Sequence, residues 1–246
     1  MIANLTAWLE ELDKLFLQTG FSSESIGSYE GIALMAYTKL AAHVDAPTVY
    51  ISSGMHGDEP AGPEAIRSLL EMGFFSERYH WQIVPVINPI GLQSGTRENA
   101  QGLDLNRDYY HLKSEEVRNH VAWLEQQTVP NLMLSLHEDW ESTGYYFYEI
   151  NTRGDQPEQA QVLMKHLDSV MFREPELVID DHDVRDQGWI YHEAVADEFE
   201  NWPEAIYMAD RGCPLSLTME TPSSVELRER VKTQIAFVQS AVDIWA

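Results

Sequence analysis

Short β-rich runs alternate with runs of helical spacing along most of this chain. The expected strands cover residues 48–52, 82–87, 132–136, 145–150 and 215–219, and the expected helices cover 1–12, 63–72, 114–127, 156–171 and 225–245. Such alternation favours a layered α/β fold, because parallel strands need helical crossovers. No repeat or Gly/Ser-rich linker divides the chain, so we predict one domain over residues 1–246. Its expected architecture is a three-layer α/β/α fold with a mixed, mostly parallel central sheet. Pro85 predicts an edge position or a bulge for its strand.

The charge of the chain limits its partners. It has 40 Asp and Glu against 16 Lys and Arg, a net charge of −24. Such a surface disfavours binding to nucleic acid and to anionic membranes, because both need clustered basic residues. No run approaches the ~20 apolar residues of a membrane span, and the N-terminus does not resemble a signal peptide. The single cysteine, Cys213, cannot form an internal disulfide and is expected to be buried. We therefore expect a cytoplasmic protein.

In a mostly parallel sheet, functional residues gather beyond the carboxyl ends of the strands. His56 and Glu59 follow the expected strand 48–52, and Pro60 suits the first turn of the next helix. One imidazole nitrogen and one carboxylate from a single turn can hold one face of a zinc ion. Taken alone, the spacing is equally typical of a helix cap beside a loop histidine.

Two further strand ends carry ionisable residues. His137 directly follows the strand 132–136, where a third metal ligand is expected. Glu220 directly follows the strand 215–219, where a carboxylate beside a metal can act as a general base. In isolation, a structural histidine and a surface glutamate are the commoner interpretations of such residues.

The loop between residues 88 and 109 is dense in polar residues and contains Arg97 and Arg107. A guanidinium can bind a carboxylate through two hydrogen bonds or stabilise a developing oxyanion. Both arginines could instead pair with some of the many acidic side chains.

Two other acidic or histidine-bearing segments carry weaker signals. The run Asp180-Asp181-His182-Asp183 could bind a cation, but we expect a solvated acidic loop. The segment beginning His192-Glu193 opens like the helical zinc-protease motif but lacks its second histidine, so we expect an ordinary helix.

The order of these pieces resembles the zinc carboxypeptidase family, from about Thr48 to the final helix. The most specific part is Asn-Pro-x-Gly-Leu-Gln at residues 88–93, followed by Arg-x-Asn-Ala-x-Gly-x-Asp-Leu-Asn-Arg at residues 97–107. This stretch is similar to the bacterial murein tripeptide amidase branch, and related patterns occur in the succinylglutamate desuccinylase and aspartoacylase group. Residues 204–210 depart from the Gly/Ser-rich segment of the amidase branch.

The resemblance implies one zinc ion per chain. His56, Glu59 and His137 match the three zinc ligands of the family, which leaves one coordination position open for water. Glu220 matches the general base that activates this water and then passes a proton to the leaving amine. Asp104 matches a carboxylate that orients the ligand His56.

The resemblance also implies how substrate is bound. Arg97 matches the residue that polarises the scissile carbonyl and stabilises the tetrahedral oxyanion. Asn106 and Arg107 match the pair that grips the terminal carboxylate of the substrate. The family usually has a mobile tyrosine near the site, and both Tyr191 and Tyr207 are available for this role.

The expected function is therefore that of a zinc metallocarboxypeptidase. Its substrate would be a small peptide or peptide-like molecule with a free carboxylate, including cell-wall-derived peptides. A zinc-dependent N-acyl amino acid deacylase is the first alternative, although the segment between Arg97 and Asn106 fits the carboxypeptidase pattern better. A non-catalytic zinc- or peptide-binding homologue is disfavoured, because Glu220 is retained together with all three ligand residues.

Overall fold

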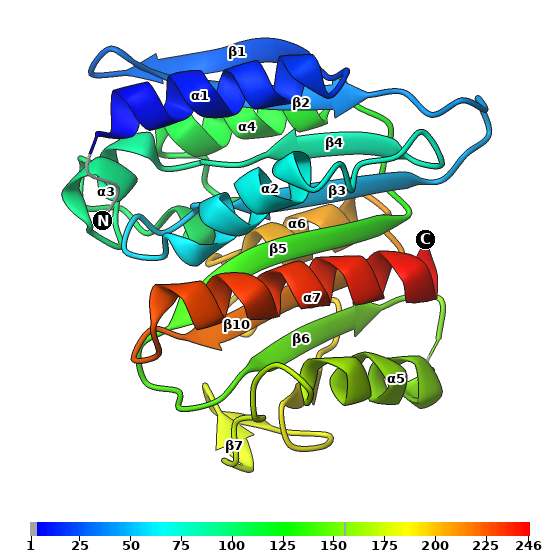
Figure 1. The fold of residues 1–246 in the computed structure, drawn as a ribbon. Coiled ribbons are helices and arrows are strands. Elements are labelled where there is room, and N and C mark those ends of the chain that lie inside the picture. Colours follow the sequence, from blue (N-terminus) through cyan, green and yellow to red (C-terminus); the bar gives the residue numbers. More distant parts are fainter. Residues whose placement is uncertain (1–3, 155) are drawn as a thin grey trace.

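The computed structural model describes residues 4–154 and 156–246, which form an eight-stranded sheet flanked by helices (Figure 1). The strand order is β1-β2-β4-β3-β5-β10-β6-β9. The strands are β1 (Ser22–Tyr29), β2 (Ile32–Lys39), β3 (Thr48–Ser53), β4 (His80–Val84), β5 (Leu132–Asp139), β6 (Tyr146–Asn151), β9 (Trp189–Tyr191) and β10 (Leu215–Pro222). A separate small hairpin contains β7 (Val178–Ile179) and β8 (His182–Asp183).

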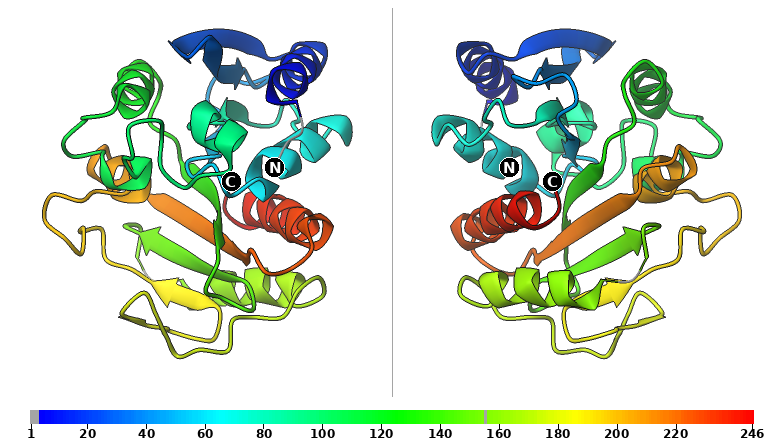
Figure 2. Two further views of the ribbon diagram at one scale, coloured as in Figure 1. Left: turned by 90° about the vertical axis from the view of Figure 1, so that its left-hand side faces the viewer. Right: turned by 90° about the vertical axis from the view of Figure 1, so that its right-hand side faces the viewer.

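Helices cover both faces of this sheet, which confirms the predicted layers. The helices are α1 (Leu5–Gln18), α2 (Ala61–Glu71), α3 (Pro89–Ser94), α4 (Glu115–Leu124), α5 (Pro157–Leu167), α6 (Glu204–Asp210) and α7 (Leu227–Trp245), with a 3-10 turn at Leu105–Arg107. Helices α1, α2, α5 and α7 lie on one face, while α4 and α6 lie on the other (Figures 1 and 2). None of the described helices combines the length and the apolar character needed to cross a membrane.

The predicted mixed sheet is also confirmed. Strands β4, β3, β5 and β10 run parallel to one another in the centre, and β6 is parallel to β9. The β1–β2, β2–β4 and β10–β6 pairs are antiparallel. Every residue of β3 is buried, as expected for a central parallel strand covered on both faces.

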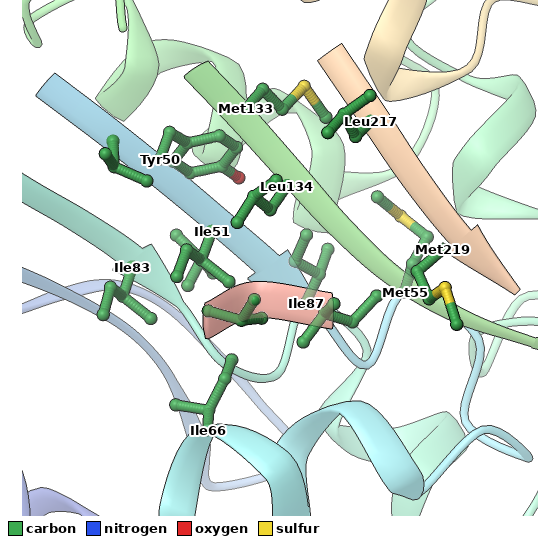
Figure 3. Close-up of a cluster of buried hydrophobic side chains, with 14 of the residues drawn as sticks. Tyr50, Ile51, Met55, Ile66, Ile83, Ile87, Met133, Leu134, Leu217 and Met219 are labelled. Carbon is green, nitrogen blue, oxygen red and sulfur yellow. The ribbon is translucent and has the colours of Figure 1, made fainter. Parts of the chain in front are cut away.

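Aligned apolar side chains form the core between the sheet and helix α2. Ile83, Ile51, Leu134 and Leu217 lie opposite one another on four neighbouring strands, and Figure 3 shows Ile66 of α2 beside this row. All five side chains are completely buried. Their burial removes several hundred Å² of apolar surface from water, which stabilises the fold at ~25 cal/mol per Å².

Two expectations about local structure are wrong. Strand β4 is not at an edge, because it lies between β2 and β3, and it ends at Val84. Pro85 therefore follows the strand and removes no ladder hydrogen bond, while its carbonyl accepts a bond of 2.5 Å from Ser53 Oγ. The residues from His192 to Ala196 form no helix and run as an irregular loop. Cys213 is buried, as expected.

Candidate metal centre and active site

The carboxyl ends of β3, β5 and β10 meet at one edge of the sheet and bring the predicted site residues together. Glu220 lies directly opposite His137 in the parallel register of β10 and β5. His56 and Glu59 lie in the turn that follows β3. The cavity at this edge has a volume of about 720 Å³. The predicted residues that line it are His56, Glu59, Arg97, Asn106, Arg107, His137 and Glu220.

His56, Glu59 and His137 face one another closely enough to share one cation. Glu59 Oε1 lies 2.6 Å from His56 Nδ1, and Glu59 Oε2 lies 2.9 Å from His137 Nδ1. One ligand atom from each residue lies within 4.8 Å of the others. Two imidazoles and one carboxylate form a donor set typical of catalytic zinc. His56 Nε2 also lies 3.0 Å from Asp104 Oδ1, the carboxylate–histidine arrangement that fixes a metal-binding ring.

The charges within this group support the same interpretation. Burial opposes ionisation of Glu59, but His56 and His137 outweigh it and lower the pKa of Glu59 to about 2. Burial also opposes protonation of His56, but Glu59 and Asp104 outweigh it and raise the pKa of His56 to about 9. Burial lowers the pKa of His137. Glu59 therefore stays ionised, and its negative charge attracts a proton or a metal cation to the position between the two imidazoles.

A hydrogen bond from helix α7 holds the backbone of β5 at His137, and the pleat of β5 turns the next side chain to the opposite face of the sheet. Gln234 of α7 is buried and donates a 2.9 Å hydrogen bond from Nε2 to the His137 carbonyl oxygen. The next residue, Glu138, points to the opposite face of the sheet because side chains alternate along a strand. There it accepts a 2.7 Å bond from the Ala61 N–H at the start of α2 and pairs with Arg230. Glu138 therefore does not add a carboxylate to the His–Glu–His group.

A glycine contact joins the turn that carries His56 to the loop that carries the arginines. A Cβ on Gly57 would lie 1.8 Å from the backbone carbon of Gly91, so only glycine fits. The Gly57 N–H donates a 2.9 Å hydrogen bond to the Thr96 carbonyl. Gly91 in turn donates to Asn88 Oδ1 at 2.8 Å, which caps helix α3. The two loops are thereby packed backbone against backbone.

This arginine loop places its basic side chains at the cavity. Arg97 donates to Asp104 Oδ2 from Nε at 3.2 Å and from Nη2 at 3.0 Å. Burial raises the pKa of Asp104, but hydrogen bonding to His56 and the positive charges of His56 and Arg97 outweigh it and hold that pKa well below its usual range. The Asn106 N–H donates to Asp104 Oδ1 at 2.9 Å, and Asn106 Oδ1 accepts from the Glu204 N–H at 2.9 Å. Arg107 Nη1 bonds the Asn106 carbonyl at 3.0 Å.

Glu220 is partly buried beside the metal-type group. Burial and the nearby carboxylates of Glu59 and Asp139 raise the pKa of Glu220 well above its usual value. A carboxyl group in such surroundings takes up a proton more readily than one in water. This property suits a residue that collects and returns a proton during a reaction.

The tyrosines of the cavity are not those expected from the sequence. The described residues that line the cavity include Tyr146 and Tyr148 of β6 but neither Tyr191 nor Tyr207. Tyr191 donates to the Asn151 carbonyl at 3.2 Å, and Tyr207 packs against Tyr109. The only sequence signal for Tyr146 and Tyr148 is that they alternate along β6, which places both on one face of the strand. That this face lines the cavity becomes clear only from the pairing of β6 with β10.

Glu204 is a buried cavity residue that no motif in the sequence indicates. It is 1% exposed and accepts bonds of 2.6 Å from both the Tyr50 and the Ser52 hydroxyls. His120 Nε2 lies 2.8 Å from the Tyr50 hydroxyl, and His120 Nδ1 lies 2.7 Å from the Tyr109 hydroxyl. Burial raises the pKa of Glu204 to about 7, despite the hydroxyl bonds that oppose this shift. Burial also lowers the pKa of His120 to about 3, so its ring is neutral.

Comparison with solved structures defines the class of the fold as carboxypeptidase-like α/β. A candidate metallopeptidase from Shewanella denitrificans OS217 superposes with a TM-score of 0.85 at 24% identity, over 98% of this chain and 91% of that one. A metallo-carboxypeptidase from Burkholderia cenocepacia has a TM-score of 0.70 at 18% identity, over 98% and 68%. A murein-tripeptide amidase from Escherichia coli O157 has a TM-score of 0.59 at 16% identity, over 92% of each chain.

The sequence-family model for the succinylglutamate desuccinylase/aspartoacylase catalytic domain matches residues 45–171, just over half of the chain. The chain therefore belongs to this family. The matched range includes the His–Glu–His group and the arginine loop, whereas Glu220 lies beyond it. A comparison with curated proteins found no match.

Proposed function

We propose that this protein is a zinc-dependent carboxypeptidase that hydrolyses an amide bond next to a free carboxylate. One observation carries the proposal: Glu220 lies opposite His137 on the adjacent strand, in the same cavity as Arg97 and Arg107. The cavity thus combines a metal-type donor set, a carboxyl group that accepts protons readily and two guanidinium groups. Metal-dependent hydrolysis of an amide bond next to a carboxylate can use each of these groups.

A zinc ion held by His56, Glu59 and His137 would supply Lewis acidity to the scissile carbonyl and to the attacking water. Glu220 takes the proton of that water and returns it to the nitrogen of the leaving amine. Arg97 is placed to stabilise negative charge on the carbonyl oxygen.

The remaining groups bind and orient. Asn106 and Arg107 are the proposed anchors of the substrate carboxylate, since a guanidinium matches a carboxylate in shape and charge. Asp104 orients His56 and holds Arg97 through the contacts described above. The cavity volume of about 720 Å³ lies within the range of small-molecule sites and leaves room for more than one amino acid.

A second candidate function is the hydrolysis of an N-acyl amino acid. It is favoured by the family match over residues 45–171. In both substrates the amino acid on the amine side of the amide bond carries the free carboxylate, so both reactions use the same groups. They differ in the acyl side, which is a peptide in one and a short acyl group such as acetyl or succinyl in the other.

One experiment separates the two candidates. Zinc-loaded protein is incubated with a pool of free-acid peptides, γ-D-glutamyl-diaminopimelate peptides, N-acetyl amino acids and N-succinyl amino acids, and the products are read by mass spectrometry. Release of a C-terminal residue supports the carboxypeptidase, whereas release of only acetate or succinate supports the deacylase. Glu220→Gln serves as the inactive control and the half-exposed Glu229→Gln as the matched neutral one. Turnover by Glu220→Gln at the wild-type rate would contradict both.

A further inference from the structure

A second group of metal-ligand side chains lies at the rim of the same cavity. It consists of His182 of β8, His192 just after β9, and Asp197 of the following loop, and we call it the rim cluster. One ligand atom from each lies within 4.8 Å of the others. The described residues contain one other such group, the His–Glu–His group above. All three residues of the rim cluster line the cavity.

The hydrogen bonds of His192 show which ring nitrogen is available. His192 Nδ1 lies 2.5 Å from the carbonyl oxygen of Glu193. A carbonyl oxygen can only accept, so Nδ1 carries the proton, and in the neutral ring Nε2 holds a lone pair. This Nε2 faces Asp197 Oδ1 at 3.2 Å. Metal-binding histidines commonly donate their second nitrogen to a backbone carbonyl in this way.

The second histidine of the rim cluster, His182, faces the same carboxylate as His192. Asp197 Oδ2 lies 3.4 Å from His182 Nε2, so one carboxylate faces two imidazoles. The two rings are close, with centroids 4.8 Å apart. One divalent cation placed among the three residues could bind a nitrogen of each ring and an oxygen of the carboxylate together.

The histidines of the rim cluster are held in place without a metal. The His192 N–H donates to the Glu149 carbonyl at 2.8 Å, which continues the pairing of β9 with β6. The ring of Tyr148 packs edge-on against His182 at 5.8 Å and against His192 at 6.3 Å. The side chain of Asp197 is 65% exposed, so a cation can reach the group from solvent.

We propose that the rim cluster is a second metal site, which binds a divalent d-block cation such as Zn²⁺. Two imidazole nitrogens and one carboxylate suit Zn²⁺, Ni²⁺ or Cu²⁺ better than the oxygen-seeking Ca²⁺ or Mg²⁺. Three protein ligands leave a coordination position open at the cavity. The bound cation ties the loop after His192 to the β7–β8 hairpin and so fixes this wall of the cavity. The proposal does not depend on the function proposed above.

Zinc binding to chelator-stripped full-length protein tests this site by calorimetry. Wild type is expected to bind two equivalents of Zn²⁺, and His137→Ala or His182→Ala alone is expected to bind one. The double variant His137→Ala/His182→Ala is expected to bind none. His43→Ala removes an exposed histidine outside both groups and is expected to keep two.

A more conservative variant tests the site even if the alanine variants do not fold. Asp197→Asn keeps the size of an exposed side chain and is expected to weaken the second equivalent by on the order of tenfold or more. A correctly folded His182→Ala that binds as many equivalents as wild type would overturn the proposal, as would unchanged affinity in Asp197→Asn.

Discussion

Replacing Glu204 by glutamine is expected to change how the stability of the protein depends on pH. The Glu204 carboxyl is buried, and burial raises its pKa from 4.5 to about 7. Between pH 4.5 and about pH 7, the folded state therefore keeps a proton on Glu204 that the unfolded state releases. The contribution of Glu204 to the free energy of unfolding should fall as pH rises from about 4.5 to about 7 and then level off.

The expected size follows from this interval. Because each pH unit between the two pKa values corresponds to about 1.4 kcal/mol, raising the pH from 5 to 8 should remove on the order of 2 to 3 kcal/mol. Glu204→Gln cannot ionise and lacks this loss. The stability of wild type relative to the variant should therefore drop by that amount over this range.

Urea unfolding of both proteins at pH 5, 6, 7 and 8 measures this difference. Other titrating groups are common to both proteins and cancel in the comparison. Glu10→Gln, on the exposed side of α1, is the matched control and should run parallel to wild type at every pH. A constant difference between wild type and Glu204→Gln across the series would refute the reasoning from burial.

Three further substitutions test the proposed chemistry. Glu220→Gln should keep its metal and lose turnover by about 10²- to 10⁴-fold, since an amide cannot collect the proton of water; rapid turnover with metal bound would remove Glu220 from the mechanism. His137→Ala should lose the zinc of the His–Glu–His group when metal content is measured by mass spectrometry, and unchanged content would contradict its role as a ligand. Arg107→Ala should raise KM about tenfold or more for free-acid substrates and far less for amidated ones, because it removes a charged hydrogen bond. Equal losses on both substrates would argue against a carboxylate anchor.

The central layers of the fold were predictable because the strands are distinct in sequence. Residues 48–52, 132–136 and 215–219 are short β-rich runs, and each became a central strand. The β1–β2 hairpin was not predicted, because β1 is mostly exposed and rich in serine. Its stability comes from pairing with β2, which its own pattern does not reveal.

The site residues also fall into those predictable from local sequence and those that only strand pairing reveals. His56, Glu59 and the arginine loop are close in sequence, so their spacing could be recognised. Tyr148 became visible only through the register of β6 against β10. His192 was expected in a helix, yet it extends the edge of the sheet through a bond to the Glu149 carbonyl. Contacts between strands determine where Tyr148 and His192 lie, and the local sequence pattern carries little information about such contacts.

The contact between Gly57 and Gly91 also limits how such a protein can evolve or be redesigned. An alanine at Gly57 would collide with the opposite backbone, and one at Gly91 would lie 2.6 Å from Asn88 Cγ. A change in one loop therefore has to preserve its backbone contact with the other. A library that varies the arginine loop to seek new substrates should therefore keep both glycines fixed. Transplanting this chemistry to another scaffold would require moving the two loops together.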